Sequence, residues 1–176
     1  AIYNDLESVE RLFKPVCSAE ETAAIFVEPI QGEGGYIVPD AGFLPGLRKI
    51  CDQHGIMLVV DEIQTGFGRT GKMFASEYWG VEPDILCLAK GIANGLPLGA
   101  IVARADVMDW QPGSHASTFG GNPVACAAAL ESIKLLRTRY IRNARVRGEQ
   151  LTEGLKKVAA ANPSLVREVR GKGLMI

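Results

Sequence analysis

Residues 57–73 read MLVVDEIQTGFGRTGKM, and the first five of them decide the fold. Asp61 closes an apolar run that predicts a buried strand. Three further segments have the same character: AAIFVEP (23–29), DILCLAK (84–90) and PLGAIVAR (97–104). Apolar strands without polar alternation, separated by helical stretches, are typical of a mostly parallel sheet. The pattern therefore predicts an α/β fold.

The segments between and after these strands have helical spacing. We expect Asn4 to cap a first helix that runs through Phe13 and ends before Pro15, and a second helix to run from about Asp40 to His54. A long helical run covers residues 124–161, with an interruption near Arg139 to Asn143. The closing residues, REVRGKGLMI, predict the start of one more strand.

Composition restricts the possible partners. The chain has 176 residues, enough for one sizeable core, and its 19 basic and 20 acidic side chains leave a net charge of −1. This balance indicates neither a nucleic acid nor a membrane as partner. No apolar run approaches the roughly 20 residues that span a bilayer. The four cysteines lie far apart, without a Cys-x-x-Cys pair or nearby histidines, so we expect buried thiols in a reducing compartment, no metal and a cytoplasmic protein.

The spacing Gly66-x-x-x-x-Gly71-Lys72 raises the possibility of a phosphate-binding loop of the nucleotidase type. Such a loop needs a Ser or Thr after the lysine to hold Mg²⁺, and Met73 occupies that position. The acidic pair Asp61–Glu62 also lies directly upstream, whereas in nucleotidases the two motifs come from different strands. We therefore favour a loop without that function.

Asp61 and Lys90 each end an apolar strand, and ligands of open α/β sheets bind beyond the carboxyl ends of the strands. A buried carboxylate or ammonium without a partner is costly. Pyridoxal phosphate would explain both residues, because its ring nitrogen stays protonated beside a carboxylate and its aldehyde condenses with a lysine amine. The alternative is that Asp61 caps the next loop and Lys90 extends into solvent.

Four segments decide between these interpretations. VEPIQGEGG, VVDEIQTGFGRTGKMFA, PDILCLAKGIANGLPLGA and HASTFGGNPVACAAAL together resemble the class III pyridoxal-phosphate aminotransferases, and within them most closely the 4-aminobutyrate branch. The resemblance implies the large domain of a fold type I transferase, with a mostly parallel sheet, over residues 1–137. It also implies a linking helix and the start of a small C-terminal domain over residues 138–176.

The resemblance also implies the cofactor-binding residues. Lys90 matches the lysine that forms the Schiff base and transfers the proton, and Asp61 matches the partner of the pyridine nitrogen. Ile63 matches the apolar residue packed against the ring, and Gln64 the amide that binds the ring's phenolic oxygen. Thr118 matches the hydroxyl residue that reaches the phosphate from the neighbouring subunit, which implies a homodimer with shared active sites. Without the resemblance, Thr118 would read as part of an ordinary turn.

Two glutamates are candidates for substrate binding. Glu28 and Glu33 lie on the EPIQGEGG loop, and Glu33 matches the family's gate glutamate, which pairs with an arginine when the substrate has no α-carboxylate. Taken alone, Glu33 would be a solvated loop carboxylate. Arg69 belongs to the family's GRTG motif, and we assign it no chemical step.

These assignments imply transamination of a small ω-amino acid, similar to 4-aminobutyrate, with 2-oxoglutarate. An acetylornithine or ornithine aminotransferase, or an amino-acid racemase of the same fold, is the alternative. A non-catalytic module and a nucleotide binder are less favoured. Because members of the family continue in both directions, we expect the chain to be an internal fragment that is inactive in isolation.

Overall fold

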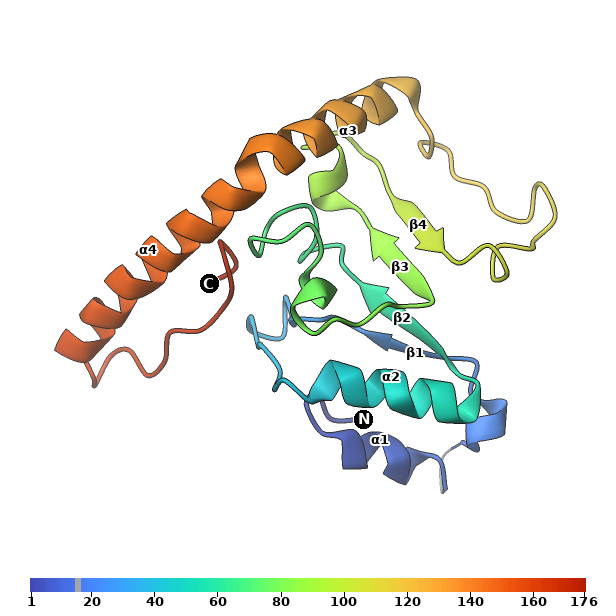
Figure 1. Cartoon of the computed structure of the whole chain (residues 1–176), viewed down its shortest axis with the longest axis horizontal. Coiled ribbons are helices and arrows are strands. Elements are labelled where there is room, and N and C mark those ends of the chain that lie inside the picture. The colour runs from blue at the N-terminus through green and yellow to red at the C-terminus, as the bar shows by residue number, and fades with distance from the viewer. Residues whose placement is uncertain (15–16) are drawn as a thin grey trace.

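The structure is a computed structural model that describes residues 1–14 and 17–176, and within them four strands form one sheet (Figure 1). Each strand lies inside a segment that the sequence predicts, and the α/β fold with a mostly parallel sheet is confirmed. β4 alone runs antiparallel, against β3. In order across the sheet, the strands are β1 (Ala24–Val27), β2 (Met57–Asp61), β3 (Ile85–Leu88) and β4 (Ala100–Ala103).

The register of the parallel strands brings two loops together. Asp61, the last residue of β2, lies opposite Cys87 of β3, and Lys90 follows Cys87 by three residues. The backbone N–H of Glu62 then donates to the carbonyl of Cys87 at 3.0 Å, which extends the pairing one step beyond β2. The loops after β2 and β3 therefore leave the sheet side by side.

Helix α2 (Phe43–His54) covers one face of the sheet. Its buried side chains, including Leu44 and Leu47, pack against Val27 of β1 and against Leu58 and Val60 of β2. The helix ends at Gly55, which has the left-handed conformation (φ 68°) that glycine adopts at helix C-termini.

Helix α1 (Leu6–Leu12) packs on the outer side of α2, and its cap differs from the prediction. Asp5, not Asn4, accepts the N–H of Ser8 at 3.0 Å. Asn4 instead has a φ of 64°, a conformation that asparagine tolerates, and its side chain donates to Asp40 at 3.0 Å. The predicted stop at Pro15 lies outside the described residues.

The long helical run has the predicted interruption, at a slightly earlier position. Helix α3 (Pro123–Leu135) passes into a π-helical turn (Leu136–Tyr140) and then into helix α4 (Ile141–Ala161). Figure 1 shows the three as one continuous rod whose α3 end packs beside β3 and β4, while α4 extends away from the sheet. After α4 the chain folds back along this helix. None of these helices, nor any other helix in the described residues, is long and apolar enough to cross a bilayer.

The prediction of a strand at the end of the chain is wrong. The backbones of Lys172 and Met175 pair in a single antiparallel bridge, and Leu174 N–H donates to the carbonyl of Arg69 at 2.9 Å. Gly171 and Gly173 have φ values of 134° and 57°, which bend the backbone away from an extended strand. The remaining short helical elements are 3₁₀ turns, at Ala19–Glu21, Ala75–Tyr78 and Lys90–Ile92.

Asp84 links three elements of the sheet layer. Its buried carboxylate accepts the N–H of Leu58 at 2.7 Å and pairs with Arg48 of α2 at 2.7 Å and with Arg104 after β4 at 2.8 Å. Burial raises the pKa of Asp84, but the bonds from Leu58 and Arg48 and the charge of Arg104 outweigh it, so the net pKa lies below 3.8. The ionised carboxylate therefore stabilises the fold.

We expect Asp84→Asn to lower the free energy of unfolding by about 3 kcal/mol, because it leaves Arg48 without its buried partner. Urea unfolding at pH 7 measures this loss. Since the folded-state pKa is depressed, the contribution is complete above the ordinary value of 3.8 and disappears as the pH falls through the folded-state pKa. Asp52→Asn, which removes an exposed partner of the same arginine, should cost less than about 0.5 kcal/mol.

Candidate active site

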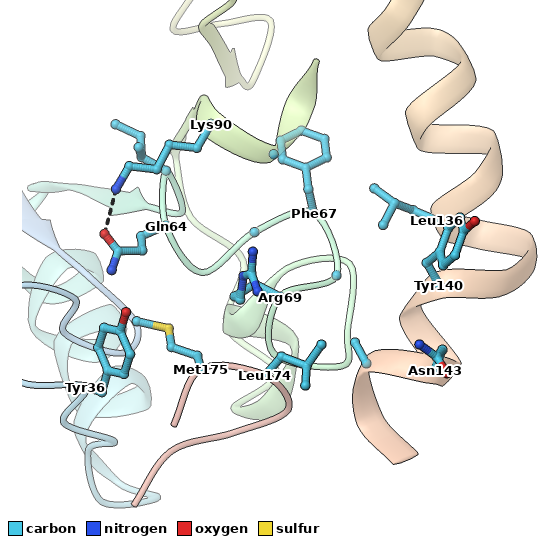
Figure 2. A pocket seen from close by; sticks show the side chains of 15 residues that line it. Tyr36, Gln64, Phe67, Arg69, Lys90, Leu136, Tyr140, Asn143, Leu174 and Met175 are labelled. Carbon is cyan, nitrogen blue, oxygen red and sulfur yellow. Dashed lines mark hydrogen bonds between the residues drawn. The ribbon is translucent and has the colours of Figure 1, made fainter. Parts of the chain in front are cut away.

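A cavity of about 590 Å³ lies beyond the carboxyl ends of β2 and β3 (Figure 2). Five segments line it: Tyr36 in the loop after β1, the loop after β2, the start of the loop after β3, the π-helical turn with the first residues of α4, and the C-terminal turn at residues 174–175. These segments are far apart in the sequence, and only the fold brings them together. The position agrees with the general location of ligand sites in open α/β sheets.

Lys90 enters this cavity directly from β3. Its backbone has a φ of 44°, an uncommon conformation for a residue with a side chain, and its Nζ donates to Oε1 of Gln64 at 2.6 Å. Figure 2 shows the two side chains reaching toward each other from separate loops. A strained backbone that aims an amine at a neutral amide is consistent with a functional lysine.

Asp61 lies at the edge of this arrangement. Its Oδ1 accepts the N–H of Ile63 at 2.9 Å, and within residues 1–14 and 17–176 no cation forms an ion pair with it. Burial and the charge of Asp61 together raise the pKa of the neighbouring Cys87. The carboxylate is thus half-buried and retains acceptor capacity for a cationic group.

The cavity favours negative charge. Of the described residues that line it, two are cationic, Lys90 and Arg69, and none is an aspartate or glutamate. Tyr140 and Asn143 add polar groups at the junction of the π-helical turn and α4. The sequence predicts roles for Lys90, Ile63 and Gln64 here, but none for Arg69, Tyr140 or Asn143. Signals for them existed in the GRTG motif and in the break of the long helix, because π-helical turns often occur at functional sites.

The two glutamates predicted to bind substrate lie outside this cavity. Oε2 of Glu28 accepts the N–H of Gly32 at 2.7 Å, so this carboxylate braces its own loop. Glu33 is exposed and lines a second cavity, of about 790 Å³, together with Arg167 and Arg170. Tyr36 borders both cavities and is their point of contact. Their substrate roles stay predictions.

Thr118 does not line the Lys90 cavity either. It lies exposed in the segment between β4 and α3, where its neighbours Ser117 and Phe119 line a third cavity, of about 570 Å³. Ile63 lines both this cavity and the one at Lys90. The structure therefore brings Lys90, Gln64 and Ile63 together at one cavity and places Thr118 in the exposed segment between β4 and α3.

The C-terminal turn closes one wall of the Lys90 cavity by close backbone contact. Gly173 lies against the backbone of Thr70, and Gly148 of α4 lies against the carbonyl of Gly173, so closely that neither position has space for a Cβ atom. Met175 is buried beside Ile30 and Ala75. The position of Leu174 and Met175 on the cavity wall thus depends on two glycines.

The sheet carries a lysine amine and a half-buried carboxylate at the ends of adjacent parallel strands, beside a cavity with two cationic side chains, and this arrangement fits the pyridoxal-phosphate transferase class. The model of the family "Aminotransferase class-III" matches residues 2–176. The chain belongs to the class III aminotransferase family. Members of this family depend on pyridoxal phosphate, so the cofactor expected from the sequence is confirmed for the family.

Curated relatives give the next level of detail. The chain is 51% identical over 163 residues to a putrescine aminotransferase of Pectobacterium atrosepticum, a match that covers 90% of the chain and 35% of the relative. It is 47% identical over 175 residues to an acetylornithine aminotransferase of Synechocystis, covering 98% of the chain and 41% of that relative. The chain therefore spans well under half the length of the curated relatives it matches.

A solved structure supports the same fold. The ornithine aminotransferase of Toxoplasma gondii, determined with partial occupancy of pyridoxal phosphate at its active site, is 41% identical and superposes with a TM-score of 0.91. The match covers 99% of the chain and 41% of that protein. These relatives are named for putrescine, acetylornithine and ornithine, so they support the ornithine-type alternative better than the 4-aminobutyrate interpretation.

We expect Gly173→Ala to destabilise the protein by about 2 to 3 kcal/mol, because the added methyl group collides with the backbone of Thr70 in a left-handed conformation. Gly154→Ala is the matched control. Gly154 lies in α4 with open space around its Cβ position, so alanine there should raise stability by about 0.5 to 1 kcal/mol. Urea unfolding of both variants at the protein's natural length distinguishes them. Equal stability of the two would contradict the close contact.

Proposed function

We propose that this chain forms the cofactor-binding part of an aminotransferase that moves the terminal amino group of an ω-amino substrate to a 2-oxo acid, with pyridoxal phosphate as cofactor. The observation that carries the proposal is the 2.6 Å bond between Lys90 Nζ and Gln64 Oε1 in the cavity beyond β2 and β3. It places an amine nucleophile next to a neutral amide where the sheet presents ligands.

The residues of the chain fit this cofactor. The half-buried carboxylate of Asp61 pairs with no cation of the described chain, and would hold the protonated ring nitrogen. Lys90 would bond to the aldehyde, Gln64 would bind the phenolic oxygen, and Ile63 would pack against the ring. Once bound, the cofactor withdraws electrons from the substrate carbon that bears the amine.

Lys90 would then act on a proton. Displaced from the cofactor by the substrate amine, its Nζ would take the proton from that substrate carbon as general base and then deliver it, as general acid, to the cofactor's C4′. Gln64 would keep the amine in place, since its Oε1 already accepts a hydrogen bond from Nζ. Arg69 and the apolar Leu174 and Met175 would surround the substrate and limit access of water.

We infer that the substrate carries a primary amine at the end of a flexible chain. Putrescine, ornithine and acetylornithine, which give the relatives their names, share this feature, as does 4-aminobutyrate. The names favour a diamine or an ornithine-type amino acid as donor over 4-aminobutyrate. We retain 2-oxoglutarate as the proposed acceptor. A racemase of the same fold would consume no amino acceptor, which measurement of glutamate formation would detect.

We further propose a homodimer in which Thr118 reaches the cofactor phosphate of the neighbouring subunit. The segment around it is exposed and carries large apolar side chains, among them Phe119 at 68% and Trp110 at 49% exposure. Exposed aromatic residues of this kind are typical of subunit interfaces. Because all four cysteines are free thiols, we place the protein in the cytoplasm. The division into residues 1–137 and 138–176 also remains a proposal, and the π-helical turn falls at that boundary.

We expect Lys90→Ala to abolish covalent attachment of the cofactor. Borohydride treatment of the loaded protein at its natural length should add the reduced cofactor to the peptide that contains Lys90, as measured by mass spectrometry. The variant should show no adduct and lose at least about 10³-fold in the rate of transamination, since nucleophile and proton carrier are the same group. Lys49→Ala, which removes an exposed lysine of α2, should keep both properties. An adduct on another lysine would refute the assignment.

We expect Glu33→Gln to change substrate discrimination. If Glu33 pairs with an arginine during the ω-amine half-reaction, the variant should lose about tenfold in kcat/KM for the ω-amine, because a charge-assisted bond is weakened. The glutamate half-reaction, in which the gate is open, should change less than about twofold. Glu82→Gln, at another exposed loop carboxylate, should affect neither half-reaction. Equal losses in both half-reactions for Glu33→Gln would contradict a gate.

A further inference from the structure

We propose that Glu62 is a positioning residue, whose buried carboxylate fixes the loop after β2 in the shape that brings Gln64 to Lys90. This inference rests on the proposed function of the site. Glu62 is fully buried, at 0% exposure, yet it does not line the cavity and no lysine or arginine of the described chain pairs with it. A buried carboxylate in this situation must be satisfied by hydrogen-bond donors.

Three donors from the same loop and its far end meet this carboxylate. Oε2 accepts the N–H of Ala75 at 2.9 Å and a short hydrogen bond from the Thr65 hydroxyl. Oε1 accepts the N–H of Ser76 at 2.8 Å. Ala75 and Ser76 open the 3₁₀ turn Ala75–Tyr78 and are themselves buried, so the carboxylate joins the beginning of the loop to its end.

The backbone of Glu62 makes two further bonds that the cavity depends on. Its N–H donates to Cys87 of β3 at 3.0 Å, and its carbonyl accepts the N–H of Gly66 at 2.9 Å. The turn from Glu62 to Gly66 is tight, since a Cβ atom on Gly66 would lie 2.7 Å from the Glu62 carbonyl oxygen. Gln64 lies at the centre of this turn, so its direction follows from the turn's shape.

The loop that Glu62 closes supplies much of the cavity wall. Phe67 and Arg69 line the cavity from within it, and Gly91, next to Lys90, lies so close to Phe67 that its Cβ position is 3.1 Å from the Phe67 Cβ. The lysine side of the cavity thus rests on a loop that Glu62 holds. Asp61 and Glu62 are consecutive but have different proposed tasks. Asp61 would bind the cofactor, whereas Glu62 holds the loop.

A glutamine at position 62 cannot reproduce these contacts. Both carboxylate oxygens accept from N–H or O–H donors, whereas an amide has one accepting oxygen and an NH₂ group that would face a donor. Glu62→Gln should therefore release one end of the loop with almost no change in side-chain volume. The variant tests the hydrogen bonds without creating a cavity.

The test uses the protein at its natural length and measures the chemical reactivity of the Lys90 amine, which does not require catalytic turnover. In the cofactor-free protein, an acetylating reagent modifies Lys90 at a rate that depends on the amine's environment. Mass spectrometry measures this rate across a range of pH, with Lys49 as internal standard. We expect Glu62→Gln to shift the midpoint of this pH profile. We also expect it to speed hydrogen exchange at the Gly66 amide about tenfold and to weaken cofactor binding about tenfold, the factor typical of one lost bond to a charged group.

Glu77→Gln is the matched control, because Glu77 is an exposed carboxylate of the same region that accepts the N–H of Phe74 at 2.8 Å. It should leave the Lys90 profile unchanged. Thr65→Val, which removes only one donor to Glu62, should shift the profile in the same direction by a smaller amount and decides the question if Glu62→Gln does not fold. A purely structural role predicts lower stability with an unchanged Lys90 profile.

An unchanged Lys90 profile in a folded Glu62→Gln protein, or in Thr65→Val where that variant decides, overturns the inference. The proposed function fails separately: in that case the unsubstituted protein shows no cofactor adduct at Lys90 after borohydride treatment. An adduct together with an unchanged profile in the variants rejects the role of Glu62 alone.

Discussion

The parallel pairing of β2 with β3 is the constraint on which the site depends. With Asp61 opposite Cys87, the chain leaves the two strands at the same edge and on the same level. A shift of this register by one residue would turn every side chain of β2 to the other face of the sheet. It would also separate Gln64 from Lys90, which are 26 residues apart in sequence and meet only because the two strands are adjacent. The proximity of the lysine, the amide and the carboxylate is therefore a consequence of one strand pairing.

Asp61 and Glu62 show two ways of placing a carboxylate inside a protein, and Asp84 shows a third. Asp61 keeps free acceptor capacity and accepts one backbone N–H. Glu62 is fully buried and satisfied by neutral donors from the loop it closes. Asp84 is buried against two arginines and contributes to stability as an ion-paired anchor. Because a buried carboxylate needs donors or cations, the surroundings of each one indicate its task. The carboxylate with the fewest donors of its own is the one available to a ligand.

The sequence predicted the elements whose signals are local. The four strands, α2 and the break in the long helix all follow from short patterns of apolar residues and turn residues. The position of Lys90 at a strand end was also predictable. The contribution of Leu174 and Met175 to the cavity was not, because it depends on a contact with the Arg69 carbonyl across a hundred residues of chain and on glycine conformations that disfavour a strand. The capping of α1 by Asp5 in place of Asn4 was not predictable either, because the Asn4 side chain binds a distant partner, Asp40.

The contact among Thr70, Gly148 and Gly173 joins an active-site loop, a helix and the C-terminal turn through main-chain atoms alone. Contacts of this kind cannot adapt by changing a rotamer, since there is no side chain to rotate. The backbone positions of the three residues therefore constrain one another. A larger residue at either glycine requires the backbone to move, and with it the wall of the Lys90 cavity that Leu174 and Met175 form. A substitution at either glycine would thus change the shape of this cavity without altering any of the side chains that line it.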